Sequence, residues 1–237
     1  MDHSVDGSRL AGVPLFGGLD AEARNEAAAT SRLTRLGAGE TLFVQDDAAT
    51  AFYVLLAGRV KIAQVTAEGH QVVIRYIAPG EVFGAVPLFT QTGYPASATG
   101  VTDCVAARWD QQATYRLMDR HPRIVLNALA IVGRRLQELQ SRYRELATER
   151  VEQRVARALL RLFGNAGQST SRPTDAFPIS RQDIAEMTGT TLHTVSRILS
   201  GWEQRGLVGG GRMRVVIRDA GGLLAIADDI RHDNHLP

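Results

Sequence analysis

The spacing of hydrophobic positions changes about halfway along the chain. An Ala- and Glu-rich helix is expected over residues 20–30, with Asp20 as its N-cap. Short β-branched and aromatic runs follow, and these predict strands over residues 41–44, 51–56, 60–65, 72–77 and 99–109. Gly58, Gly69 and Gly80 recur every 11 residues, which puts glycine at successive corners. The pattern predicts a wound antiparallel β structure, a jelly roll or a small barrel.

The pattern becomes helical after residue 122. Apolar residues then follow the a and d positions of a heptad repeat: Leu129, Val132, Leu136, Leu139, Tyr143 and Leu146. A seam this narrow is typical of a helix that meets an identical helix across a two-fold axis, so it predicts a homodimer. The alternative is packing on the chain's own β domain, for which a wider apolar stripe is usual. A second helix is expected over residues 151–163, and a loop over 164–178.

Two short helices joined by a glycine turn are predicted near the C-terminal end. Ser180 and Asp183 have the spacing of a capping box at the start of the first helix. Gly189 ends that helix, because a left-handed residue is needed there. Thr190 or Thr191 then caps a second helix that runs to about residue 202–205. The arrangement is a helix-turn-helix, contained in residues 179–207.

A small core and a β hairpin complete this predicted domain. Ile184, Val195 and Ile198 are spaced to pack between the two helices, and Ala185 keeps one side chain small where they cross. Two strands, residues 207–208 and 213–217, are expected to flank the sequence Gly209-Gly-Gly-Arg212. A hairpin after a helix-turn-helix makes the winged form of this motif.

The second helix of this motif is the element that enters the major groove of DNA. Its exposed face carries the predicted base-reading residues His193, Ser196 and Arg197, because arginine pairs bidentately with guanine and histidine bonds base edges. The residues expected to contact phosphates are Arg181, Gln182, Thr190, Thr191, Thr194 and Arg212. The alternative is a winged helix that is used only for protein contacts.

Charge distribution favours the DNA-binding interpretation. Residues 150–218 hold 11 arginines and 5 acidic residues, whereas residues 1–120 hold 10 basic and 13 acidic residues. A basic segment beside acidic ones is typical of a nucleic-acid-binding domain, although an arginine-rich solvated face gives the same count. No run of about 18 apolar residues and no signal peptide is found, so a cytoplasmic protein without membrane contact is expected.

Two other classes of protein are the alternatives to a DNA-binding regulator. An enzyme is not expected, because the sequence has no Walker loop, no metal-binding histidine cluster and no Ser/His/Asp arrangement with structural context. A ligand-binding module without DNA activity is the third class. The single cysteine, Cys104, excludes an internal disulfide and a four-cysteine iron–sulfur cluster.

Three segments together resemble the Crp/Fnr family of transcription regulators: residues 80–84 (GEVFG), 154–160 (RVARALL) and 179–199 (ISRQDIAEMTGTTLHTVSRIL). The resemblance implies an α+β protein with a cyclic-nucleotide-binding-like β-roll over residues 1–120, a dimerisation helix over 121–149 and a winged helix-turn-helix over 150–220. An acidic tail, residues 221–237, would follow. RNA polymerase is implied as a partner, recruited or blocked by a dimer bound to a palindromic operator.

The resemblance also implies an effector pocket, which would map to Gly84, Ala85, Ala96, Ser97, Leu139 and Gln140. Cyclic-AMP-binding members have a glutamate after the glycine to hold the ribose, and an arginine before the serine to hold the cyclic phosphate. This chain has Ala85 and Ala96 at those two positions. A cyclic phosphate needs charged or equivalent donors, so cyclic AMP is not expected to bind in the usual mode.

Haem is the other cofactor that the family uses. The candidate ligands His3, His70 and His121 are each more typical of surface histidines. Carbon-monoxide-sensing members place a histidine where this chain has Val86-Pro87. The motifs Tyr94-Pro-Ala-Ser-Ala and His-x-x-Ser-Arg are most similar to the nitrogen-oxide-responsive (Dnr/NnrR-like) subgroup. Two hypotheses follow: a ligand-gated regulator that pivots about residues 146–150, or a constitutively competent one with a degenerate pocket.

Overall fold

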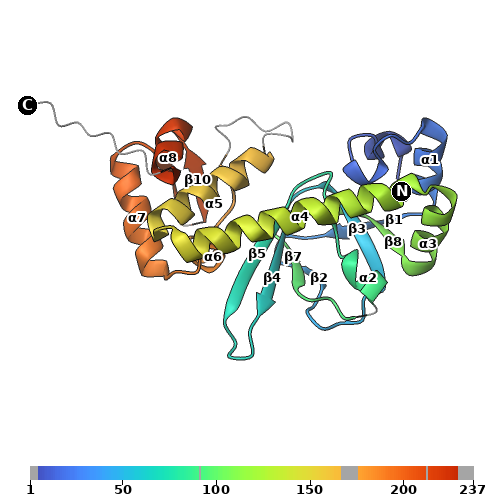
Figure 1. Cartoon of the computed structure of the whole chain (residues 1–237), viewed down its shortest axis with the longest axis horizontal. Coiled ribbons are helices and arrows are strands. Elements are labelled where there is room, and N and C mark those ends of the chain that lie inside the picture. The colour runs from blue at the N-terminus through green and yellow to red at the C-terminus, as the bar shows by residue number, and fades with distance from the viewer. Residues whose placement is uncertain (1–4, 91, 167–175, 212, 229–237) are drawn as a thin grey trace, which may run out of the picture. The chain divides into compact units, whose positions relative to one another are not determined.

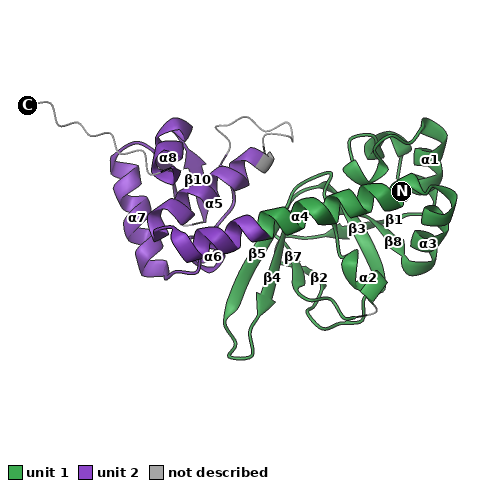
Figure 2. Ribbon diagram, viewed as in Figure 1, with its two compact units in different colours: residues 1–139 green, residues 140–237 purple. Residues whose placement is uncertain are grey.

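The computed structural model describes residues 5–90, 92–166, 176–211 and 213–228. The chain divides into two compact units, residues 1–139 and 140–237 (Figure 2). One continuous helix, α4 (Arg123–Thr148), contributes residues to both units (Figure 1). Among the described residues, no helix is both long and apolar enough to cross a bilayer.

The first unit begins with three short helical segments, η1 (Gly7–Leu10), η2 (Pro14–Phe16) and α1 (Ala21–Ala29). The carboxylate of Asp20 accepts a hydrogen bond of 2.8 Å from the backbone N–H of Ala23, so the predicted N-cap of α1 is confirmed. Apolar side chains of these segments are buried against the β structure that follows.

Two four-stranded antiparallel sheets form the β-roll, with strand orders β1-β8-β3-β6 and β2-β7-β4-β5. The eight strands are β1 (Arg32–Leu36), β2 (Thr41–Phe43), β3 (Ala51–Ala57), β4 (Val60–Val65), β5 (Gln71–Ile77), β6 (Val82–Phe83), β7 (Ser97–Gly100) and β8 (Cys104–Asp110). The wound β structure is therefore confirmed.

The expected single strand over residues 99–109 is wrong. The chain leaves one sheet at Gly100, turns through residues 101–103 and enters the other sheet at Cys104. Gly100 lies too close to neighbouring backbone for a side chain, since an added Cβ would be 2.7 Å from the carbonyl oxygen of Gly37. The polar pair Thr102-Asp103 at the turn was the available signal.

Aromatic side chains fill both parts of the β-roll core. Trp109 stacks on Phe52 with ring centroids 4.9 Å apart, and its indole N–H donates to the carbonyl oxygen of Ala27 at 2.8 Å. Between the two sheets, four rings form a second cluster, named here the aromatic cluster: Phe43, Tyr53, Phe83 and Tyr94.

Helices α2 (Val86–Thr90) and α3 (Gln111–Arg120) lead to α4, which carries two apolar stripes. Ile124, Ala128 and Ile131 pack against the core of the first unit. The six seam residues listed above lie on other positions and are all exposed, from 48% for Val132 to 75% for Tyr143. Packing on the β domain thus uses a different stripe, and the heptad seam remains uncovered in the single chain.

The second unit contains α5 (Val151–Ala166), α6 (Arg181–Thr188), α7 (Leu192–Gln204), β9 (Val208–Gly211), β10 (Arg214–Ile217) and α8 (Ala220–Ala227). The expectation of an acidic tail from residue 221 is wrong for residues 221–227. These residues form most of α8, because Leu223 and Ala227 are fully buried there. The rest of the expected tail, beyond residue 228, lies outside the described residues.

Candidate nucleic-acid interface

The first helix of the motif, α6, begins and ends as its sequence predicts. The hydroxyl oxygen of Ser180 accepts from the backbone N–H of Asp183 at 3.0 Å, and the Asp183 carboxylate accepts from the N–H of Ser180 at 3.2 Å. This reciprocal pair is the predicted capping box. Gly189 has φ 61° and donates to the carbonyl oxygen of Ala185, so the left-handed turn is also confirmed.

The small core between the helices differs from the prediction at one position. Ile184, Ala185 and Val195 are buried, as expected. Ile198 is only half-buried, and the inner face of α7 continues instead through Leu199 and Trp202. The helical period explains the difference, because positions 195, 199 and 202 lie on one stripe and position 198 lies beside it.

Helix α7 presents the predicted base-reading residues on its outer face. Its N-cap is Thr191, whose hydroxyl accepts from the N–H of Thr194 at 3.2 Å. His193 and Arg197 are exposed and Ser196 is half-buried. These three side chains lie within the first two turns of the helix, and a recognition helix contacts base edges with its N-terminal residues.

The predicted phosphate-contacting residues surround the N-termini of α6 and α7. Gln182 is exposed and donates to the carboxylate of Glu186 at 3.0 Å. Thr191 and Thr194 share a hydroxyl contact of 3.0 Å, and Thr190 lies in the turn before them. The first-turn N–H groups of a helix favour anions, so these positions suit a phosphate. Arg212 lies outside the described residues.

Arg181 has a structural task besides any contact with DNA. Its guanidinium group forms an ion pair with Glu203 at 3.0 Å and lies 3.4 Å from the carbonyl oxygen of Ser196. Ser196 and Glu203 both belong to α7, so Arg181 connects the start of α6 to the reading helix. The side chain is 24% exposed, which leaves part of the guanidinium accessible.

The hairpin is shifted relative to its prediction. Gly209, Gly210 and Gly211 form most of β9, whereas they were expected in the loop. Antiparallel pairing with β10 puts Gly210 opposite Val215, and an added Cβ on Gly210 would lie 2.3 Å from the carbonyl oxygen of Arg214. Only glycine fits this approach, so the glycine run was a signal for close strand packing as well as for a turn.

Sequence reasoning missed two arginines of the hairpin. Arg214, on β10, and Arg218, directly after it, are both exposed. The guanidinium of Arg218 lies over Gly209, where an added Cβ would be 2.6 Å from its Nε. The charge count over residues 150–218 includes both arginines. The sequence around the turn does not indicate whether their side chains are exposed.

Two rings of the aromatic cluster lie beside Gly84, one of the six residues predicted to line the effector pocket. An added Cβ on Gly84 would lie 3.3 Å from the ring of Tyr94 and 3.4 Å from the ring of Tyr53. The Tyr94 ring stacks on Phe43 with centroids 3.8 Å apart, and its hydroxyl donates to the carbonyl oxygen of Ala51 at 2.7 Å. Burial raises the pKa of Tyr94, so the phenol stays neutral.

The remaining predicted pocket residues do not form a set of ligand donors. Ala96 is buried in the β-roll, and Ala85 packs against the core of the first unit. The hydroxyl of Ser97 accepts from the backbone N–H of Gln45 at 2.9 Å. Leu139 and Gln140 are exposed on α4. Direct donors for a cyclic phosphate are therefore missing at the two positions where cyclic-AMP-binding members supply them.

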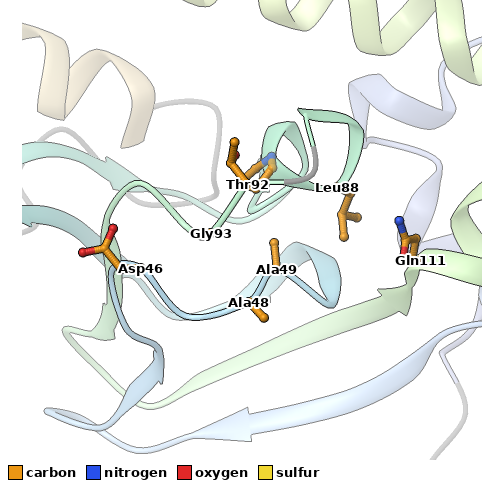
Figure 3. A pocket seen from close by; sticks show the side chains of 8 residues that line it. Asp46, Ala48, Ala49, Leu88, Thr92, Gly93 and Gln111 are labelled. Carbon is orange, nitrogen blue, oxygen red and sulfur yellow. The ribbon is translucent and has the colours of Figure 1, made fainter.

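A separate open groove of about 460 Å³ lies on the first unit (Figure 3). It runs between Ala48-Ala49, the segment that includes Leu88 and Gly93, and the side chain of Gln111. Asp46 supplies a carboxylate at its edge. None of the groove's lining residues belongs to the predicted effector pocket.

His70 and His121, two of the candidate haem ligands, lie on different elements of the first unit. The Nε2 atom of His121 lies 3.0 Å from a carboxylate oxygen of Glu26, and this hydrogen bond, together with Arg120, lowers the pKa of Glu26. His70 is exposed at the turn between β4 and β5, and His3 lies outside the described residues. Over the described part of the chain, no three His, Cys, Asp or Glu side chains gather as metal ligands would.

Comparisons with known proteins agree with this architecture. Residues 33–121 match the family described as cyclic nucleotide-binding domain, and residues 153–226 match the Crp-like helix-turn-helix domain. The chain is 30% identical to the cyclic AMP receptor protein of Thermus thermophilus, over 92% of this chain and 98% of that protein. It is 31% identical to the nitrogen fixation regulation protein FixK of Bradyrhizobium diazoefficiens, over 80% of this chain and 79% of that protein.

A solved structure shows the same fold. FixK2 from Bradyrhizobium japonicum superposes with a TM-score of 0.73, at 22% identity, over 83% of this chain and 96% of that one. A sensory-type β-roll followed by a winged helix-turn-helix with a polar reading face defines a DNA-binding transcription regulator. The chain belongs to the Crp/Fnr family of such regulators, and its relatives are regulators, not enzymes.

Replacement of Gly189 by alanine tests the turn of the motif. An alanine at φ 61° is strained, so we expect Gly189→Ala to lower the free energy of unfolding by about 1–2 kcal/mol. The control is Gly201→Ala in the interior of α7, where an added Cβ meets no atom within 4 Å. That change should stabilise the protein by up to about 1 kcal/mol. Urea unfolding measures both, and equal effects would contradict the assigned turn.

Proposed function

We propose that this chain acts in the cytoplasm as a homodimer that reads a palindromic DNA operator and thereby recruits or blocks RNA polymerase. The observation that carries the proposal is the outer face of α7, where His193, Ser196 and Arg197 stand at the positions of base readers. In a two-fold dimer, two such helices fit successive major grooves about 34 Å apart.

The heptad seam on α4 supports the dimer. Six apolar side chains are about half or more exposed along one line of the helix, and isolated exposed apolar residues are common but a continuous line is not. A second copy of α4 would cover this seam through knobs-into-holes packing. Arg135 and Glu138 lie beside the seam and form an ion pair with each other at 2.7 Å. The six seam residues themselves carry no charge.

Specific roles follow for the reading helix. Arg197 suits the O6 and N7 atoms of a guanine, because a guanidinium group donates two parallel hydrogen bonds. His193 stands where family members commonly carry a glutamate, which accepts from cytosine. Histidine donates as well as accepts, so the preference at that base pair should differ. Arg214 and Arg218 on the hairpin add phosphate contacts outside the major groove.

The aromatic cluster supports a regulator that does not depend on cyclic AMP. The Thermus relative is named a cyclic AMP receptor protein, but here Tyr94 packs over Gly84, and Ala85 and Ala96 bring no charge. A ligand would have to displace a stacked ring and a buried hydrogen bond. Of the two hypotheses, we favour the constitutively competent regulator. The contact of His121 with Glu26 also argues against His121 as a haem ligand.

Arg197→Ala tests the reading face. A preferred operator is first selected from random duplexes with the wild-type protein. We expect the variant to lose about 1–3 kcal/mol of binding free energy on that operator and to relax one base position. Arg214→Ala is the control for phosphate contacts, since it should weaken all sequences evenly and lower the salt slope by about one. Unchanged affinity and site choice in Arg197→Ala would show that this face does not read DNA.

Leu136→Glu tests the dimer. Leu136 is 55% exposed in the single chain, so a glutamate costs little there, but two glutamates would oppose each other inside a paired seam. We expect the variant to be monomeric at micromolar concentration in light scattering. Gln137→Glu, exposed on the next position and off the seam, should stay dimeric. A dimeric Leu136→Glu protein would place the interface elsewhere.

Addition of cyclic AMP tests the effector proposal. We expect no heat of binding and no change in operator affinity at millimolar cyclic AMP, because the donors for its phosphate are missing. The Thermus thermophilus relative serves as a positive control for the nucleotide preparation. A several-fold gain in operator affinity would overturn the constitutive interpretation.

A further inference from the structure

The corner between α4 and α5 is held by buried and half-buried charges, all within the second unit (Figure 2). Helix α4 ends at Thr148 and α5 starts at Val151, so only two residues connect them. A short connection alone does not fix the angle between two helices. That angle is fixed by side chains that form contacts across the connection.

The strongest of these bridges starts from Glu145, in the last turn of α4. Its side chain is only 7% exposed, and both carboxylate oxygens accept from Nη1 of Arg161 on α5, at 2.7 and 2.8 Å. Ser141 makes a longer contact with the same carboxylate at 3.4 Å. A carboxylate buried to this degree is costly without its partner, so the Glu145–Arg161 pair strongly favours one angle between the helices.

Two arginines of α5 fix the connection itself. Nε of Arg157 lies 3.0 and 3.1 Å from the two carboxylate oxygens of Glu149. Arg154 donates to the carbonyl oxygen of Glu149 at 2.8 Å and to that of Thr188 at 3.1 Å. Arg154 therefore ties the corner to the last turn of α6. We call these bridges, made by Glu145, Glu149, Arg154, Arg157 and Arg161, the corner clamp.

The dimer seam reaches into the same region. Leu146, the last seam residue, follows Glu145 directly, and its Cδ2 would lie 3.3 Å from a Cβ added to Gly189. The end of the seam thus contacts the turn between α6 and α7. Residues 146–150 were predicted to be the pivot. In the structure, Glu145 before this segment and Glu149 within it both pair with arginines of α5.

We propose that Glu145 and Arg161 are positioning residues, which hold the reading helix at a fixed angle to the end of the dimer seam and so set the spacing between operator half-sites. The inference rests on the proposed dimeric function. Neither side chain needs to touch DNA. A fixed angle on each protomer keeps both reading helices in register with one spacing, and a two-site complex is tight only when both sites are engaged without strain.

The test uses the full chain and three duplexes: the selected palindrome, the palindrome with one base pair inserted at its centre, and a single half-site. The variants are Glu145→Gln, Arg161→Met and the double change, which remove the charges but keep most of the side-chain volume. Glu138→Gln, an exposed acid on α4 outside the clamp, is the matched control. Fluorescence anisotropy gives each affinity, and thermal melting reports folding.

We expect each clamp variant to lose about tenfold in affinity for the palindrome while half-site affinity stays within about twofold of the wild type. Discrimination against the inserted base pair should fall by a similar factor. The double change should match the single changes, because two groups that act as one pair are not additive. Glu138→Gln should behave as the wild type does.

The proposal is overturned if palindrome affinity and spacing discrimination stay unchanged in the folded variants. It is also overturned if half-site and palindrome affinities fall together, since that pattern reports damage to the reading domain itself. Where Glu145→Gln does not fold, Arg161→Met, at a side chain that is 35% exposed, carries the same test. A wild-type protein that binds half-site and palindrome equally would instead refute dimeric reading, and with it the role of the clamp.

Discussion

The structure depends most on helix α4, which carries two separate stripes of apolar residues. Helix α4 closes the core of the first unit with Ile124, Ala128 and Ile131, while its heptad seam stays exposed. A helix has 3.6 residues per turn, so two stripes of apolar residues can run along it without competing for the same face. The first stripe packs within the single chain, and the second is the face on which we propose that another copy packs.

Electrostatics at the end of this helix connects packing to DNA reading. Within the corner clamp, the carboxylates of Glu145 and Glu149 pair with Arg161 and Arg157, and Arg154 donates to backbone carbonyl oxygens. Arg197 of α7 and the hairpin arginines Arg214 and Arg218 are exposed, and we propose that they contact DNA. The positive charge of the second unit is therefore divided between a structural set and a binding set, a division that a count of arginines does not show.

The β-roll is filled at Gly84 by aromatic side chains of the chain itself. Ala85 and Ala96 carry no charge, and the ring of Tyr94 lies over Gly84. A buried tyrosine ring adds apolar contact area, and when its hydroxyl forms a hydrogen bond no polar group is left unsatisfied. This packing is the basis of the proposal that the regulator does not depend on a bound nucleotide.

Local patterns in the sequence determined much of this protein. The capping box, the left-handed Gly189, the heptad seam and most strands follow from interactions between residues near in sequence, which propensity and periodicity report directly. Tertiary structure alone decided where β7 ends and β8 begins, the strand role of the hairpin glycines, the burial of α8 and the position of Tyr94. It also decided which arginines bind glutamates and which stay exposed, because packing of one element against another brings the partners together.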